Sequence, residues 1–142
     1  MSHASSAPPR AAYSALDART FRSSELTRGP WHPDHQHAGP PIALVCRRLE
    51  LAAQAHGLNH LSRLTANLLR PVPIGDLVVE VMTDYAGRNA AHFSAHLMCG
   101  NKDIARFTAL AQREAATALP TPLAGHPLPV LTPGPDEAPP AQ

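Results

Sequence analysis

The sequence predicts an α+β domain in which one helix packs on an antiparallel sheet of about five strands. One stretch, residues 42–56, has the three- and four-residue spacing of apolar side chains that is typical of an amphipathic helix. The segments that follow it have apolar residues at every second position and are separated by short turns. Because short turns join antiparallel neighbours, we expect these segments to form one sheet.

The folded part of the chain is expected at residues 19–114, between two flexible segments. A length of 142 residues suits one domain and excludes a second domain of full size. Eight of the 16 prolines lie in the last 26 residues. Since proline removes backbone donors and fixes φ, residues 115–142 are predicted to be a Pro-rich disordered tail. Residues 1–18 are rich in serine and alanine and are predicted to be flexible as well.

The helix predicted at residues 42–56 follows Pro40 and Pro41, which suit a first turn because the amide hydrogens there have no partner within the helix. Gly57 is expected to end the helix, because glycine is common directly after a helix C-terminus. One face is apolar and is expected to be buried, whereas Arg47 and Glu50 lie on the polar side. The apolar face consists of Ile42, Val45, Cys46, Leu49, Ala52 and Ala53.

Five segments are predicted to be strands. Four follow the helix, at residues 64–69, 77–85, 91–99 and 104–113, and an additional short strand is predicted at residues 20–26. Turns that contain Gly75, Gly87 and Gly100 separate the four later strands. The alanine, leucine and glutamine content of residues 104–113 also permits a helix, but the short turn before this segment favours a hairpin.

Charge and composition argue against several classes of protein. Twelve Lys and Arg residues against eleven Asp and Glu residues give a net charge of +1, a poor match for a nucleic acid backbone. Cys46 and Cys99 match no metal-binding spacing and no disulfide framework, so both are expected to be free thiols. No apolar run is long enough for a signal peptide or a membrane span. We therefore expect a soluble, cytoplasmic protein that has no membrane span and does not bind nucleic acid.

Several short motifs occur in a recognisable order along this pattern of elements. They are Gly29-Pro30-Trp31-His32-Pro33, His37-Ala38-Gly39-Pro40-Pro41, Arg63-Leu64-Thr65, Leu69-Arg70-Pro71-Val72-Pro73 and Gly87-Arg88. In these motifs the chain resembles the thioesterase-like family of hotdog proteins, and in particular the N-terminal half of the double-hotdog acyl-CoA thioesterases. The resemblance covers the predicted folded part. It implies a single hotdog fold, in which a curved antiparallel sheet wraps around one central helix.

The resemblance implies an enzyme that hydrolyses an acyl thioester of coenzyme A or of an acyl-carrier protein without a cofactor. Amides at the start of a helix carry partial positive charge, so His37 and Gly39 are candidates for orienting and polarising the carbonyl, unless Gly39 only initiates the helix. Asn67 and Thr65 share a strand face and are candidates for holding the attacking water, unless these polar residues only face solvent. Asp34 is a candidate base, although a loop acid that forms a local turn is the alternative.

In addition to Thr65, six further residues are expected to bind the substrate. The resemblance implies this role for Trp31, Ala38, Cys46, Arg63, Arg70 and Arg88. Arginine binds phosphate bidentately, so the three arginines are candidates for the phosphates of coenzyme A, although each also suits an exposed strand end.

Two positions depart from the family pattern. Ala38 stands where the family has the first glycine of a His-Gly-Gly motif, and alanine tolerates fewer conformations than glycine. Cys46 stands where related single-hotdog thioesterases commonly have a carboxylate on the central helix. A buried, unreactive thiol is the expected role of Cys46 on an apolar helix face. A non-catalytic acyl-binding or assembly subunit is therefore the alternative to a hydrolase.

The loop before the helix also permits a metal site, since imidazole and carboxylate groups are ordinary ligands of zinc and iron. The candidate ligands are His32, Asp34, His35 and His37. Because this loop coincides with the substrate loop of the family, no metal is predicted. A single hotdog leaves sheet edges exposed, so we expect a homodimer, or pairing with a second hotdog chain, with the site at the interface.

Overall fold

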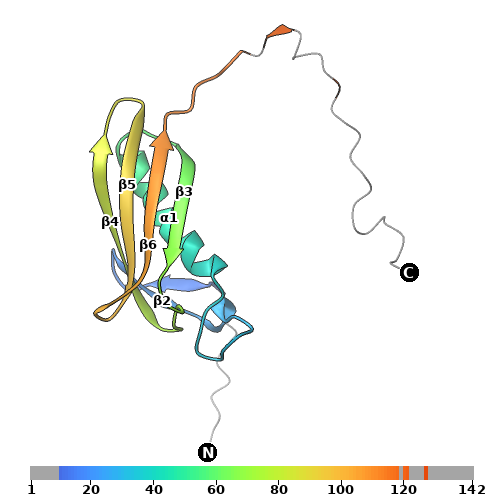
Figure 1. Cartoon of the computed structure of the whole chain (residues 1–142), viewed down its shortest axis with the longest axis vertical. Coiled ribbons are helices and arrows are strands. Elements are labelled where there is room, and N and C mark those ends of the chain that lie inside the picture. The colour runs from blue at the N-terminus through green and yellow to red at the C-terminus, as the bar shows by residue number, and fades with distance from the viewer. Residues whose placement is uncertain (1–9, 119, 122–126, 128–142) are drawn as a thin grey trace, which may run out of the picture.

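Six antiparallel strands form one curved sheet, and a single helix packs across one of its faces (Figure 1). The protein is described by a computed structural model over residues 10–118, 120–121 and 127. The elements are β1 (Tyr13–Ala15), β2 (Thr20–Ser23), a 3-10 turn η1 (Glu25–Thr27), α1 (Gly39–Ala55), β3 (His60–Leu68), β4 (Asp76–Ala86), β5 (Ala90–Cys99) and β6 (Lys102–Gln112). The strand order is β1-β2-β4-β5-β6-β3, so β3 is an edge strand beside β6. The predicted α+β fold is confirmed.

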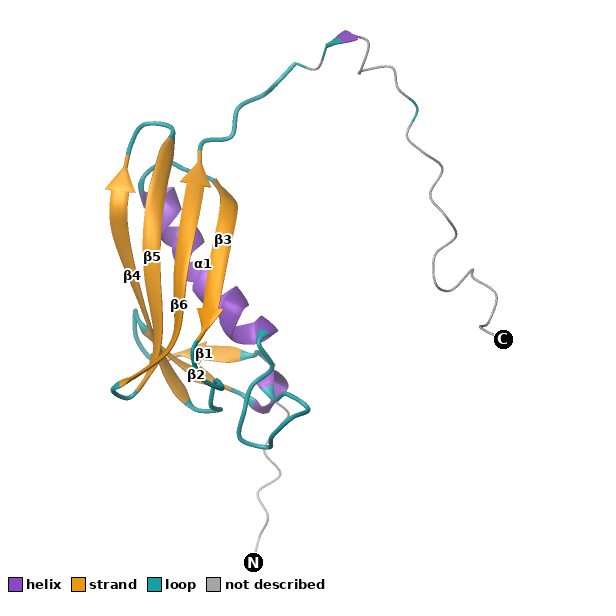
Figure 2. Ribbon diagram, viewed as in Figure 1, coloured by secondary structure: helices purple, strands orange, loops and turns teal. Residues whose placement is uncertain are grey.

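The helix begins before its predicted start. Pro40 and Pro41 lie in the first turn of α1, where their missing amide hydrogens are not needed. The helix ends at Ala55, and Gly57 follows with a φ of 69°, a conformation that glycine adopts at little cost. The short connection from α1 to β3 makes the two run side by side in opposite directions, as Figure 2 shows.

The core lies between α1 and the face of the sheet that α1 covers, which we call the inner face. Val45, Leu49 and Ala53 form the buried stripe of the helix. Alternate residues of the strands complete the core, among them Leu77, Val79, Phe93, Ala95, Leu97, Phe107, Ala109 and Ala111. The residues between them lie on the opposite, outer face of the sheet. None of the described helices is long and apolar enough to span a membrane.

Replacement of Leu49 with alanine is expected to lower the free energy of unfolding by about 2–5 kcal/mol, because its removal leaves a cavity under α1. Leu49 is 0% exposed, whereas Leu51 on the same helix is 37% exposed. The matched control, Leu51→Ala, is expected to lose less than about 1 kcal/mol. Chemical denaturation of the two variants measures the difference, and equal losses would contradict this placement of the core.

The structure corrects the expected boundary of the folded part. β1 lies within residues 1–18, the segment expected to be flexible, and it pairs with β2. The strand forms because Tyr13 packs against the core and its hydroxyl donates a hydrogen bond to Oε1 of Gln36. The predicted disordered tail at residues 115–142 lies mostly outside the described residues.

The strand predicted at residues 20–26 is shorter than expected. β2 ends at Ser23, and the next residues form η1. The hydroxyl oxygen of Ser24 accepts a hydrogen bond from the Leu26 N–H at 3.3 Å. A serine that caps the start of a turn in this way competes with the extended strand.

Candidate active site

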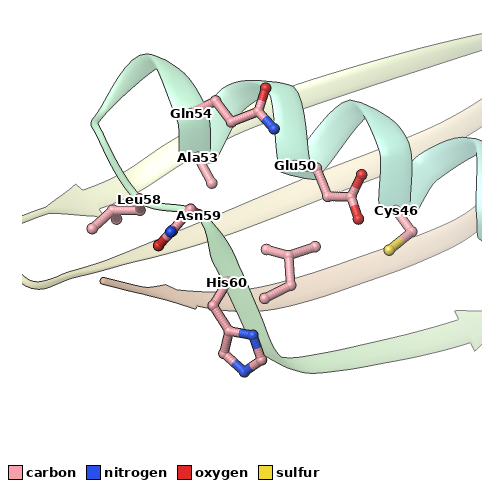
Figure 3. Close-up of a pocket in the computed structure, with 8 residues that line it drawn as sticks. Cys46, Glu50, Ala53, Gln54, Leu58, Asn59 and His60 are labelled. Carbon is pink, nitrogen blue, oxygen red and sulfur yellow. The ribbon is translucent and has the colours of Figure 1, made fainter. Parts of the chain in front are cut away.

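A cavity of about 350 Å³ opens between the second half of α1 and the start of β3 (Figure 3). Cys46 and Glu50 are one helical turn apart, so both lie on the same side of α1. The chain reverses at Gly57, and the fully buried Leu58 follows it, so that the start of β3 forms the opposite wall. Figure 3 shows the Cys46 thiol and the Glu50 carboxylate projecting from α1 toward β3. The lining residues are Cys46, Glu50, Ala53, Gln54, Leu58, Asn59, His60 and Leu61.

Glu50 places a carboxylate in this cavity. Its Oε2 accepts a hydrogen bond at 3.3 Å from Nη1 of Arg47, an exposed residue of the preceding turn. Among the described residues Arg47 is its one hydrogen-bond donor. The second carboxylate oxygen, Oε1, is therefore available to a water molecule or a ligand.

Cys46 is a weak nucleophile in this position. It is half-buried rather than fully buried as expected. Burial, and to a smaller extent the Glu50 carboxylate, raises the pKa of the Cys46 thiol above its ordinary value. The thiol is therefore protonated at neutral pH, and the thiolate is the form that attacks carbonyl groups. Because the thiol is unreactive, the groups of the cavity that can accept a proton are the Glu50 carboxylate on α1 and the His60 imidazole at the start of β3.

One wall of the cavity is held in place by contacts with the segment that follows β6. Nδ2 of Asn59 donates a hydrogen bond to Oε2 of Glu114, and the Glu114 N–H donates to Oδ1 of Asn59, both at 3.0 Å. Nδ1 of His60 lies 4.0 Å from Oε1 of Glu114. These contacts hold the start of β3, and with it one wall of the cavity, against the end of β6.

A second region, the loop before α1, is held in place by Gln36, a buried residue that the sequence analysis missed. Its N–H donates to the Val72 carbonyl at 2.8 Å and its Nε2 donates to the Pro73 carbonyl at 2.7 Å. Its Oε1 accepts from the Tyr13 hydroxyl, and burial raises the pKa of Tyr13 well above its usual value, so the hydroxyl stays protonated. These bonds fix where α1 begins.

His37 and Gly39 lie at the exposed start of α1. The Gly39 N–H donates a long hydrogen bond of 3.3 Å to Nδ1 of His37, and the His37 N–H donates to the Thr27 carbonyl at 2.7 Å. At 1.5 Å per residue, Gly39 and Glu50 are separated by about 16 Å along the helix axis. One carbonyl group therefore cannot contact both residues of a single chain.

Asp34 lies in the same loop and is exposed. Its carbonyl accepts a hydrogen bond from the Ile74 N–H at 2.8 Å, and its N–H donates to Nδ1 of His32 at 3.1 Å. The backbone of Asp34, rather than its carboxylate, thus makes these contacts, and the residue does not line the Glu50 cavity.

Arg63, Thr65 and Asn67 lie on the outer face of β3. Thr65 and Asn67 are paired with Thr108 and Arg106 of β6, and the residues that alternate with them pack toward the core. The predicted shared face of Thr65 and Asn67 is confirmed. Because the sheet separates the outer face from α1, these side chains do not join the Glu50 cavity within one chain.

The remaining predicted substrate residues are divided between the two ends of the sheet. Trp31, Ala38 and Arg70 line one cavity of about 230 Å³ near the start of α1. Arg88 lies in the turn between β4 and β5, where its carbonyl accepts from the Arg113 guanidinium at 3.1 Å, near the end of α1.

The histidines of the loop do not form a metal site in the part of the chain that the structure describes, where no three His, Cys, Asp or Glu side chains are grouped to hold an ion. His32 and His35 stack on one another instead, with ring centroids 4.3 Å apart.

Sequence reasoning assigned Glu50 to the polar side of α1 and did not connect it with the site. The available signal was its spacing of one helical turn from Cys46, the position at which a carboxylate was expected. The spacing alone did not reveal that the start of β3 faces this side of the helix.

The comparisons with known proteins place the chain in a family and a fold. The family model for the acyl-CoA thioesterase N-terminal domain matches residues 27–113, which include the loop before α1 and all elements from α1 to β6. No curated protein matches the sequence.

Solved structures with similar folds carry little sequence identity. The PaaI protein from the phenylacetic acid degradation operon of E. coli has a TM-score of 0.62 and 20% identity, over 69% of this chain and 72% of that one. A conserved protein with a hot dog fold from Alicyclobacillus acidocaldarius has a TM-score of 0.63 and 19% identity, over 88% of this chain and 45% of that one. A proposed thioesterase, yhdA, from Lactococcus lactis has a TM-score of 0.58 and 17% identity, over 66% of this chain and 79% of that one. These likenesses confirm the expected hotdog fold.

Proposed function

The chain belongs to the family of acyl-CoA thioesterase N-terminal domains, and from this membership we propose that it hydrolyses an acyl thioester in the cavity beside Glu50. The observation that carries the proposal is the Glu50 carboxylate, which projects into a cavity between α1 and an exposed edge strand. It supplies the acid that the sequence lacks at position 46.

In the proposed reaction Glu50 acts as a general base toward a water molecule. The water oxygen forms a bond to the thioester carbonyl carbon while its proton passes to Glu50. Collapse of the tetrahedral intermediate breaks the bond between carbon and sulfur and releases the carboxylic acid. The proton on Glu50 then passes to the thiolate that leaves. Cys46 takes no covalent part, because its thiol is protonated at neutral pH.

The developing oxyanion needs a donor, and Gly39 at the start of α1 offers its N–H. The axial separation of about 16 Å between Gly39 and Glu50 puts that donor out of reach within one chain. We therefore propose that the donor comes from a second copy of the chain, or from another hotdog chain, which pairs with this one along β3.

The geometry of the fold supports such a composite site. β3 is an exposed edge strand, and the Glu50 cavity lies at its start. Ala38, next to the start of α1, lines a cavity together with Leu68 at the end of β3. A two-fold axis that pairs two β3 edges in antiparallel fashion brings the start of one strand beside the end of the other. Gly39 of the partner subunit then lies toward Glu50 of this one.

The proposal is tested with purified protein and a panel of acyl-CoA esters of different chain length, with release of the free thiol as the measurement. Turnover of at least one ester by a dimeric protein is expected. The same panel on an acyl-carrier protein identifies the preferred carrier. If no ester is hydrolysed while an acyl-CoA raises the melting temperature, the hydrolase is excluded in favour of the non-catalytic acyl-binding subunit, which the replacement of the usual carboxylate by Cys46 also suggests.

A further inference from the structure

The sheet has a second long free edge, along β4 on the side away from β3. β2 pairs with β4 only as far as Val78, and one further bond joins the Val79 N–H to the Arg19 carbonyl at 2.9 Å. Beyond this bond, residues 80–86 of β4 have no strand on this side among the described residues. Backbone groups two residues apart on a strand point to the same side, so the N–H and C=O of Val81 also point to the free side. They are open to an added strand.

A groove of about 290 Å³ lies between this edge and α1. Its apolar lining consists of Leu51 and Ala52 from α1 and of Val79 and Val81 from β4. Leu51 is 37% exposed, although it is apolar. A strand added beside β4 with apolar side chains toward α1 extends the core across this groove.

Two arginines complete the lining of the groove, and one of them has no acidic partner. Arg19 is paired, because its Nη1 lies 3.5 Å from Oε1 of Glu80. Arg48 makes no ion pair among the described residues. Its guanidinium carbon lies 5.7 Å from the centroid of the Phe21 ring, and its Nε is buried without a hydrogen-bond partner in the described part of the chain. Because a buried donor without an acceptor is unfavourable, the groove favours an occupant that brings a carboxylate to Arg48.

Residues 128–136 of this chain, which lie outside the described residues, have a proline spacing that fits such an edge. Proline has no N–H to donate, so within sheets it is confined to edge strands, where its nitrogen faces solvent. The prolines at 127, 129, 133 and 135 all have odd numbers, so in an extended chain they share one side. The N–H groups that turn to the other side belong to Leu128, Val130, Thr132, Gly134 and Asp136. The prolines that exclude a central strand therefore permit an edge strand.

The same alternation sorts the side chains of this segment. Leu128 and Val130 share a face with Asp136, whereas Glu137 belongs to the opposite face. Asp136 and Glu137 are the only acids after Glu114, and no lysine or arginine follows residue 113. The face that carries the free N–H groups thus combines apolar side chains with one carboxylate, which matches an apolar groove with one unpaired arginine.

The end of β6 lies close enough for this segment to reach the edge. Ala111 of β6 pairs with Ala91 of β5, which pairs with Ala86 of β4, so β4 and β6 end at the same end of the sheet (Figure 1). A strand added beyond β4 lies three strand spacings from β6, about 15 Å. The thirteen residues 115–127 span about 20 Å as a coil and more when extended. A chain that crosses this end of the sheet and returns along β4 runs antiparallel to it.

We propose that residues 128–136 bind to the free edge of β4 in the same chain as an added antiparallel strand. The even-numbered side chains face α1, and the Asp136 carboxylate binds Arg48. Part of the tail that the sequence predicts to be disordered is then ordered. The added strand covers the edge along β4 and leaves the β3 edge open to a second chain. This interaction does not depend on hydrolysis.

Amide hydrogen exchange of the full chain, followed residue by residue by NMR, tests the proposal. The N–H groups of Val81, Val130 and Thr132 are expected to exchange about tenfold or more slowly than in an unstructured chain, whereas the Leu131 N–H is not. Met82 is the internal control, because its N–H points to β5 and is protected in either case. Unprotected N–H groups at Val81 and Val130 overturn the proposal.

Paired variants in the tail separate strand pairing from a nonspecific contact. Val130→Pro places a proline on the pairing side and is expected to abolish the protection of Val81, whereas Leu131→Pro places it on the solvent side and is expected to preserve it. Asp136→Asn is expected to reduce this protection, and Glu137→Gln is not. Equal effects within either pair contradict the proposed alternation. Protection of Val81 that rises with protein concentration would assign the added strand to another copy and overturn the arrangement within one chain.

Discussion

Replacement of Glu50 with glutamine is expected to lower kcat for acyl-CoA hydrolysis by about 10²–10⁴-fold, the range observed when a general base is lost. Glutamine has nearly the same shape as glutamate but cannot take the proton of the attacking water at neutral pH. The amide still fills the wall of the cavity and still faces Arg47, so KM is expected to change little. Steady-state kinetics on the best ester of the panel separates the two constants.

Two controls accompany this variant. Glu80→Gln removes one negative charge from an exposed glutamate of β4 that does not line the cavity, and it is expected to retain wild-type kcat. Cys46→Ala tests the neighbouring thiol. Activity that survives Glu50→Gln but is lost in Cys46→Ala would transfer the chemistry to the thiol and refute Glu50 as the base.

Most of the fold could be predicted from the sequence, because the patterns that indicate its helix and strands lie within short segments of the chain. The apolar spacing and the proline pair predicted α1, and the period-two pattern with its glycine turns predicted β3 to β6. The composition of residues 104–113 also permitted a helix. These residues lie almost entirely in the strand β6, as the short hairpin turn before them indicated. β1 was not predicted because three residues are too few for a pattern, and because Tyr13 is held by the core and by Gln36, which are distant in sequence.

The candidate site was predictable only in part, because its parts come together through tertiary structure. The motif residues Trp31, Ala38 and Arg70 do meet at one cavity. Thr65 and Asn67 of β3 face away from α1. The sequence did not predict this, because alternation along a strand tells which residues share a face but not which face the helix covers. Glu50 becomes part of a cavity only because the chain reverses after Gly57 and brings the start of β3 to this side of α1.

Mixing two inactive variants is expected to restore activity if each site takes Gly39 from one subunit and Glu50 from the other. Gly39→Pro removes the amide hydrogen of the oxyanion donor, and Glu50→Gln removes the base. A heterodimer of the two has one site with both groups intact and one site with neither. After unfolding and refolding at equal amounts, random pairing is expected to give about a quarter of the wild-type activity per subunit.

The alternative arrangement gives a different result in the same experiment. If both groups of a site came from one chain, every site in the mixture would carry one defect, and the mixture would stay as inactive as its components. The positions of the two groups on α1 favour the first result, because a helix holds Gly39 and Glu50 about 16 Å apart along its axis whatever its surroundings. Gly39→Ala controls for shape, since an added Cβ meets only Nδ1 of His37 at 3.7 Å and the amide hydrogen is retained. This variant is expected to keep most of the activity that Gly39→Pro loses, and equal losses in the two would show that the side-chain space, rather than the N–H, is what the site requires.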